Sequence, residues 1–329
     1  MSQYRYAFAV GRIRALENKL LTPERLQRMV DATSAEEAYR LLTEAGYGTP
    51  GEQVIDFEQQ ISYELQKVVM LMKELDADPE LIDLLYLHYD LHNIKSLYKE
   101  RFAAEQKVID LSVLGKIPLE TLTKAMSESN YDELPKPFQE KLQKADKEMI
   151  DQIDPGRLDA WLDQAYYQTI LDASKKHRSV FLKDYFALSA DFNNLLMALR
   201  LHAMSLDHAI FEELYLPGGS LAISDLTPIF SNELTEKSFA GSRFSKHLIS
   251  AYHEYKSQGF KLAILEKNRD NFLFKLASET DQGSVSIGPV LRYLLAREQE
   301  AKAIRLILTG KLNHVNDKLI SERVRELYA

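Results

Sequence analysis

Two histidines on one short segment are the first residues whose spacing suggests chemistry. His88 and His92 are four positions apart, so on a helix they would lie on one face, a spacing that some zinc-binding helices use. Asp90 lies two positions from each of them and would point away, so it could not join the same site. A later segment of similar sequence has Ser189 and Asn193 at the matching positions. We therefore interpret the histidines as ordinary polar helix residues and predict no metal site.

Paired carboxylates are the second candidate chemistry. Glu36 with Glu37, and Glu298 with Glu300, could suggest acid–base catalysis, but charged pairs on helices usually face solvent. The chain has no Gly-x-x-x-x-Gly-Lys-Ser/Thr motif, no nucleophile elbow and no cysteine, which excludes thiolate catalysis and Cys-ligated metals. The sequence thus predicts no catalytic residue, no nucleotide-binding residue and no cofactor. A helical enzyme that uses His88 and His92, or a carboxylate pair, is one alternative, and tightly bound metal would support it.

Composition limits the remaining classes of protein. The 329 residues include only 13 Gly and 10 Pro, so we expect long helices and few connections. Acidic residues outnumber basic ones by 49 to 41, which argues against general nucleic-acid binding. No signal peptide is visible, and no apolar run approaches the eighteen residues that a membrane-spanning helix needs. We expect a cytoplasmic protein without a membrane span.

Helix-start signals recur along the chain and favour an all-α fold. Thr22 and Asp154 each precede a proline, which is typical of an N-cap followed by proline in the first turn, and Asp78 repeats this pattern. Ser34 and Glu37 have the spacing of a capping box. Glycine and proline clusters predict turns, and Pro289 is suited to open the last long helix. The predicted turns lie at 46–51, 216–220 and 282–288.

One predicted helix shows a clear apolar stripe. Its apolar positions have helical spacing and run along one face. Trp161 and Tyr166 lie on this stripe and could be imagined as a ligand-binding pair, but aromatic side chains at this spacing are usually core. The stripe consists of Leu158, Trp161, Leu162, Ala165, Tyr166, Thr169 and Ile170.

An internal repeat is the most informative feature. Residues 83–95 align without a gap with residues 184–196, so that Asp90 meets Asp191 and Asn93 meets Asn194. Residues 300–305 form a weaker third copy, in which Glu300 takes the aspartate position. In that copy Ala303 replaces the asparagine, and Arg297 interrupts the apolar stripe.

Flanking segments recur in the same order. Residues 115–122 resemble residues 219–226, and residues 20–26 have a similar break. We predict three similar helical units at 1–104, 105–210 and 211–329. The repeated polar residues are predicted to satisfy backbone groups at helix crossings or caps, since a repeated fold repeats such contacts; partner binding is the alternative. These residues are Asp90, Asn93, Asp191, Asn194, Glu300 and, at the end of the third copy, Arg305.

Three segments together resemble a known family. Residues 6–21 resemble the start of the C subunit of V/A-type ATPases and ATP synthases, whose counterpart in the eukaryotic V-ATPase is the d subunit. The Asp-x-x-Asn helices at Asp90 and Asp191, and residues 297–305, also fit that family, although Ala303 stands where the family often has asparagine. The resemblance covers essentially the whole length of the chain.

The resemblance implies a fold and a role. Members of this family are all-helical, with three similar domains around a pseudo-threefold axis that form a funnel. The family has no catalytic site and lies in the central stalk of the rotor. It links the shaft of subunits D and F to the membrane ring of proteolipid subunits, and so couples ATP turnover to H⁺ or Na⁺ transport. This implies a peripheral position on the cytoplasmic side of the membrane, without nucleic acid. A generic helical scaffold that binds an unrelated protein is the alternative function.

Overall fold

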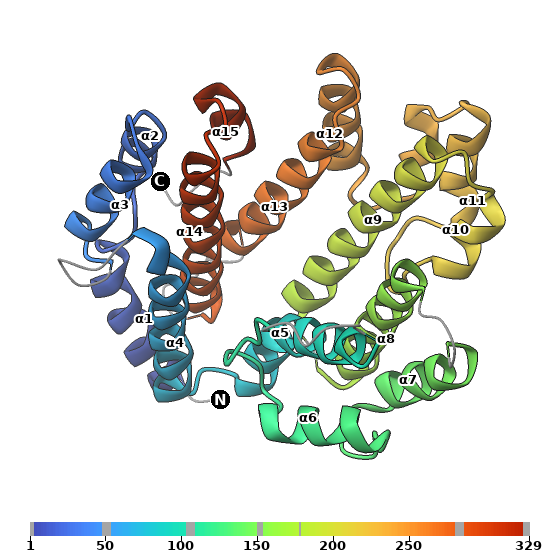
Figure 1. Cartoon of the computed structure of the whole chain (residues 1–329), viewed down its shortest axis with the longest axis horizontal. Coiled ribbons are helices and arrows are strands. Elements are labelled where there is room, and N and C mark those ends of the chain that lie inside the picture. The colour runs from blue at the N-terminus through green and yellow to red at the C-terminus, as the bar shows by residue number, and fades with distance from the viewer. Residues whose placement is uncertain are drawn as a thin grey trace. The chain divides into compact units, whose positions relative to one another are not determined.

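The fold is helical throughout the part of the chain that the structure describes. A computed structural model describes residues 3–47, 54–102, 109–149, 154–177, 179–279 and 286–324. These ranges contain α-helices, three short 3-10 helices and no strand, which confirms the all-α prediction (Figure 1). None of their helices combines the length and apolar character needed to cross a bilayer. The chain divides into two compact units, residues 1–79 with 266–329, and residues 80–265.

Unit 1 is built around its last long helix, α14 (Gly288–Leu312). This helix contacts α1, α2, α3, α4 and α15 (Figure 1), and most of its residues are buried. Ile13, Leu42, Ile61 and Ile304 are among the side chains that fill this core. The other elements of unit 1 are α1 (Gln3–Glu17), α2 (Pro23–Val30), α3 (Ala35–Glu44), η1 (Val54–Asp56), α4 (Phe57–Leu75), most of α13 (Leu262–Glu279) and α15 (Asp317–Arg323).

Unit 2 packs long helices against one another through large aromatic side chains. The helix α8 contacts α7, α9 and α10, and Trp161, Phe138, Phe192 and Phe211 are each at most 1% exposed. Ion pairs from Lys95 to Asp163 and from Lys99 to Asp159 also link α5 to α8. The elements are α5 (Pro79–Glu100), α6 (Leu119–Glu128), α7 (Lys136–Glu148), α8 (Pro155–Lys176), α9 (Val180–Ala203), α10 (His208–Leu214), α11 (Ile223–Leu226), η2 (Thr227–Ser231), η3 (Glu236–Phe239) and α12 (Ser245–Ser257).

The predicted helix starts are mostly confirmed. The Thr22 hydroxyl accepts a hydrogen bond from the Arg25 N–H (3.3 Å), and the Asp154 carboxylate accepts one from the Arg157 N–H (3.0 Å). Proline occupies the first turn of α14 as well, and α5 begins at the predicted Pro79. Of the predicted turns, part of 46–51 and most of 282–288 lie outside the described residues.

The capping box at Ser34 is only half formed. The Ser34 hydroxyl accepts from the Glu37 N–H (3.2 Å), as predicted. The Glu37 carboxylate, however, does not return to Ser34. It accepts from the N–H and the hydroxyl of Thr33 (2.8 and 2.6 Å), because Thr33 offers two donors on the same side of the helix end.

The apolar stripe of α8 is also confirmed, with one adjustment. Trp161 is 1% exposed, and Leu158, Leu162 and Ile170 are buried. Tyr167, the neighbour of Tyr166 in the sequence, is more buried than Tyr166, and its hydroxyl lies 2.7 Å from the Ser189 hydroxyl. A second aromatic pair, Tyr252 and Tyr255, is buried on α12. Trp161 and Tyr167 are therefore core residues, whereas the predicted Tyr166 is only partly buried.

Candidate functional site

The first repeated polar pair fixes a loop to α5. Asp90 is fully buried, and its carboxylate accepts hydrogen bonds from the N–H groups of Lys116 (3.1 Å) and Ile117 (2.9 Å). These residues directly precede α6, whose N-cap residue is Pro118. The buried carboxylate of α5 thus binds the loop that leads into the next helix, which we name the Asp90 contact.

Asn93 completes this attachment one turn later. Its side-chain amide donates to the Ser112 carbonyl oxygen, and its side-chain oxygen accepts from the Ser112 N–H, both at 2.8 Å. The amide therefore pairs with both backbone groups of one loop residue, as a neighbouring β-strand would. Such a contact satisfies a buried asparagine and fixes the position of the loop.

The second copy repeats this geometry on α9. The Asp191 carboxylate accepts from the N–H groups of Ser220 (2.7 Å) and Leu221 (2.9 Å), and Leu221 precedes Ala222, the N-cap residue of α11. Asn194 pairs with both backbone groups of Leu216, at 2.9 and 2.8 Å. We name this the Asp191 contact.

The Asp191 contact has more donors than the Asp90 contact. The hydroxyl groups of Ser220 (2.5 Å) and Ser242 (3.2 Å) also donate to the Asp191 carboxylate. Burial raises the pKa of Asp191 and of Asp90 above the ordinary carboxyl value, and the loop N–H donors oppose that rise. In the described contacts these carboxylates are bound by neutral N–H and hydroxyl donors.

A glycine is required at the same point of both loops. Gly115 and Gly219 each directly precede the first N–H donor. A Cβ atom built on either glycine would overlap the aspartate carboxylate of its own contact. The short aspartate side chain can reach the backbone only if the loop comes this close, and only glycine permits that approach.

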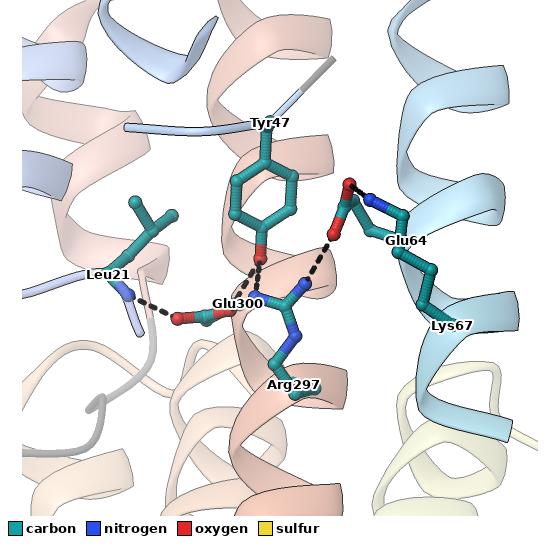
Figure 2. A network of polar contacts seen from close by, with 6 residues as sticks. All are labelled: Leu21, Tyr47, Glu64, Lys67, Arg297 and Glu300. Carbon is teal, nitrogen blue, oxygen red and sulfur yellow. Dashed lines mark hydrogen bonds and ion pairs between the residues drawn. The ribbon is translucent and has the colours of Figure 1, made fainter. Parts of the chain in front are cut away.

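The third copy binds a loop from the other end of the chain. Glu300 on α14 is 1% exposed, and its carboxylate accepts from the N–H of Leu21, which precedes Thr22, the N-cap residue of α2 (Figure 2). Leu21 thus occupies the position that Ile117 and Leu221 have in the other copies. We name this the Glu300 contact. It joins residues 279 positions apart in the sequence.

The Glu300 contact is surrounded by further buried charges. Arg297 donates to the Glu300 carboxylate (2.6 Å) and to Glu64 on α4 (3.1 Å), while Glu64 also accepts from Lys67 (2.6 Å). The Tyr47 hydroxyl donates to Glu300 (2.5 Å) and accepts from Arg297 (2.6 Å). Figure 2 shows these side chains converging from three segments of unit 1.

This network of buried charges explains why Arg297 interrupts the apolar stripe of the third copy on α14. Arg297 lies at a position that is apolar in the other copies, yet its side chain is only 8% exposed, because Glu64 and Glu300 neutralise it there. Burial raises the pKa of Glu300, which Arg297 opposes, and burial raises the pKa of Tyr47 well above its ordinary value. The tyrosine therefore stays protonated and remains a donor to Glu300.

Two positions of the third copy, Ala303 and the predicted Arg305, take no part in these contacts. Ala303, at the asparagine position of the third copy, is fully buried and apolar. Arg305 lies on the surface of α14, where its Nε binds the Glu58 carboxylate at 2.8 and 3.0 Å. The structure therefore brings together Glu300 and Arg297 but not Glu300 and Arg305, because Arg305 lies on another side of α14.

The histidines of α5 bind backbone carbonyls. One ring nitrogen of His88 lies 2.8 Å from the Leu85 carbonyl oxygen, and one of His92 lies 3.0 Å from that of Asp110. Among the described residues, no three His, Asp or Glu side chains are grouped as ligands for a metal ion.

Comparison with known proteins assigns the family. The family model described as "ATP synthase (C/AC39) subunit" matches residues 9–323. The chain belongs to the C/AC39 family. All three contacts lie inside the matched range, and the resemblance noted from residues 6–21 and from the repeated helices is confirmed.

Relatives in the C/AC39 family are similar over nearly their full length. The C subunit of the A-type ATP synthase of Thermococcus kodakarensis is 23% identical, over 98% of this chain and 91% of the relative. The corresponding protein of Methanocaldococcus jannaschii is 25% identical, over 98% and 86%. The C subunit of the V-type sodium ATPase of Enterococcus hirae is 22% identical, over 96% and 97%.

Sequence reasoning identifies the acidic residues of the Asp90, Asp191 and Glu300 contacts but not all their partners. It misses Tyr47 and Glu64, because no repeat marks them and they lie more than 230 positions from Arg297. A signal for Leu21 is present, since the break at residues 20–26 resembles those before the helices at 119 and 223. That likeness alone does not connect Leu21 to Glu300.

Proposed function

We propose that this chain is a non-catalytic central-stalk subunit of a V/A-type rotary ATPase or ATP synthase. In this proposal it connects the shaft of subunits D and F to the membrane ring of proteolipid subunits. It thereby couples ATP turnover to transport of H⁺ or Na⁺. It is peripheral, on the cytoplasmic side of the membrane, and has no catalytic site of its own.

The observation that carries this proposal is the family match over residues 9–323. The relatives it resembles along nearly their whole length are named as subunits of A-type ATP synthases and of a V-type sodium ATPase. A match of this extent favours the same position in a complex, because the whole chain rather than one motif is shared.

The three carboxylate–loop contacts support a three-unit architecture. Asp90, Asp191 and Glu300 each bind the N–H that precedes an N-cap residue. We propose three similar units near 1–104, 105–210 and 211–329, arranged as a funnel around a pseudo-threefold axis. The N-terminal loop at Leu21 then supplies to the third unit what the loops at Ile117 and Leu221 supply to the others.

Such contacts suit a subunit that transmits torque. Buried carboxylates with several donors hold each loop against its long helix, and packed helices resist deformation better than free loops. A rotor connection that yields under load would lose the coupling between ATP turnover and ion transport.

Reconstitution tests the proposal. The chain is mixed with purified subunits D and F, and separately with detergent-solubilised proteolipid ring, and complexes are measured by size-exclusion chromatography with mass determination. We expect a complex in both cases. Adding the chain to the remaining rotary complex in vesicles should restore ATP-driven ion transport without raising intrinsic ATP hydrolysis of the catalytic subunits. A chain that binds neither shaft nor ring would overturn the proposal and favour the generic scaffold.

A further inference from the structure

A pocket of unit 2 lies between α7, α8 and the end of α10, and the side chain of Lys141 lines it. Its volume is about 580 Å³, and it is open to solvent. The helices α7 and α8 pack against each other beside it (Figure 1). Gln164 of α8 and Tyr215, the C-cap residue of α10, also line the pocket. A small solute can therefore reach the Lys141 side chain from this pocket.

The ammonium group of Lys141 has a neutral partner. Lys141 is partly buried, and its Nζ donates a hydrogen bond to the Gln164 side-chain oxygen at 2.7 Å. The Gln164 side-chain nitrogen donates to the carbonyl oxygens of Glu213 and Tyr215, at 2.7 and 3.0 Å, so the acceptor is held in place. A lysine ammonium has three donors, and the described contacts use one of them. Lys141 is thus partly desolvated without an ion pair among the described residues.

Two carboxylates close to Lys141 are bound by other cations. Glu213 on α10 pairs with Arg157 at 2.7 Å, and Asp172 on α8 pairs with Lys175 at 2.7 Å. These ion pairs satisfy the carboxylates at the pocket without using the Lys141 ammonium.

The surroundings of Lys141 favour its uncharged form. Burial lowers the pKa of Lys141, and the positive charge of Lys144 lowers it further. Glu140 and Glu213 oppose this lowering, and Glu140 lies 4.0 Å from Lys136 on the same helix. At neutral pH a larger share of Lys141 is therefore the free amine than in an ordinary solvated lysine. The free amine is the nucleophilic form of this side chain.

We propose that Lys141 is a modification site that accepts an acyl group from a small acyl phosphate in this pocket. The free Nζ attacks the acyl carbon, and the new C–N bond forms as the C–O bond to phosphate breaks. The phosphate leaves with the electron pair, and the amine proton passes to water. The resulting amide has no charge but keeps one N–H that can donate to Gln164. The site goes beyond the proposed function, because its chemistry is independent of the rotary complex.

Site-resolved acetylation of the purified chain tests this site. The folded chain is treated with acetyl phosphate at neutral pH and then unfolded, and the remaining amines are labelled with deuterated acetic anhydride. Mass spectrometry then gives the ratio of light to heavy acetyl groups at each lysine. We expect Lys141 to react about fivefold faster than Lys144, because more of it is the free amine.

Lys144 is the matched control, since it lies on the same helix. Its ammonium is 4.1 Å from the centroid of the Trp161 ring and 3.8 Å from the Glu148 carboxylate, and both favour the charged form. In urea the pocket is lost, so Lys141 and Lys144 should react at similar rates. In the folded chain, the ratio of the two rates should fall as the pH rises toward the ordinary lysine pKa of about 10.4.

Three outcomes would overturn the modification site. These are equal rates for the two lysines in the folded chain at neutral pH, a ratio of rates that urea leaves unchanged, or a ratio that does not change with pH. The last would mean that access alone favours Lys141. A chain that binds neither shaft nor ring but shows the expected ratios would contradict the proposed function alone.

Discussion

The Asp191 contact of unit 2 and the Glu300 contact of unit 1 solve one structural problem with different chemistry. In both, a buried acid on a long helix binds the N–H before an N-cap residue. Asp191 is bound by neutral donors at most 51 positions away, whereas Glu300 is bound by Arg297 and by a loop residue 279 positions away. The comparison teaches that a buried acid can bind the same backbone N–H with neutral donors around it, as at Asp191, or with a buried cation beside it, as at Glu300.

Removing the buried cation of Arg297 should have the largest effect on the stability of the protein. Arg297→Ala leaves Glu64 and Glu300 buried without their shared partner, so we expect the free energy of unfolding to fall by about 3–5 kcal/mol. Urea denaturation monitored by circular dichroism measures this. The control is Arg305→Ala, whose ion pair is about half exposed and should cost less than about 1 kcal/mol. Equal losses for the two variants would contradict the distinction drawn between them.

Replacing Asp191 and Asp90 with alanine should show which of the two contacts contributes more to stability. Asp191→Ala leaves the donors of Ser220, Leu221 and Ser242 without their acceptor, so we expect a loss of about 3 kcal/mol. Asp90→Ala leaves only two backbone donors and should cost about 2 kcal/mol. Denaturation of both variants under the same conditions gives the order, and a larger loss for Asp90→Ala would mean that the extra hydroxyl donors contribute nothing.

Replacing a glycine with alanine should have opposite effects on stability at Gly219, where the loop lies close to Asp191, and at Gly11, which lies inside a helix. Gly219→Ala places a methyl group against the Asp191 carboxylate, so we expect a loss of about 1–3 kcal/mol. Gly11 lies within α1 with no atom within 4 Å of an added Cβ, so Gly11→Ala should instead stabilise by about 0.5–1 kcal/mol. Thermal unfolding compares the two, and opposite signs are the expected result.

The smallest effect is on the pH dependence of stability. The pKa values of Asp90 and Asp191 are raised in the folded state, so folding binds protons. Their contribution is complete below the unfolded pKa of about 3.9 and is lost as pH rises through the folded pKa. Between pH 4 and 7, the free energy of unfolding of Asp90→Asn/Asp191→Asn should therefore fall less steeply with pH than that of the wild type.

Local sequence signals predicted the helices well, whereas the contacts of the candidate site between distant residues could not be predicted. Thr22, Asp154 and Pro289 indicated where helices begin, because caps and proline act within one turn. The repeat identified Asp90 and Asp191, whose loop donors at Ile117 and Leu221 follow 27 and 30 positions later in the sequence. It gave no means of pairing Arg297 with Tyr47 or Glu64, since those contacts depend on how separate helices pack.

The bond between Glu300 and Leu21 has a consequence for synthesis of the chain on the ribosome. The first four α-helices leave the exit tunnel long before their buried neighbour, since α4 ends at Leu75 and α14 begins at Gly288. Residues 80–265 can thus fold while the earlier helices still expose the apolar faces that α14 later covers. Nascent chains of this protein should accordingly need chaperone protection until translation is nearly finished.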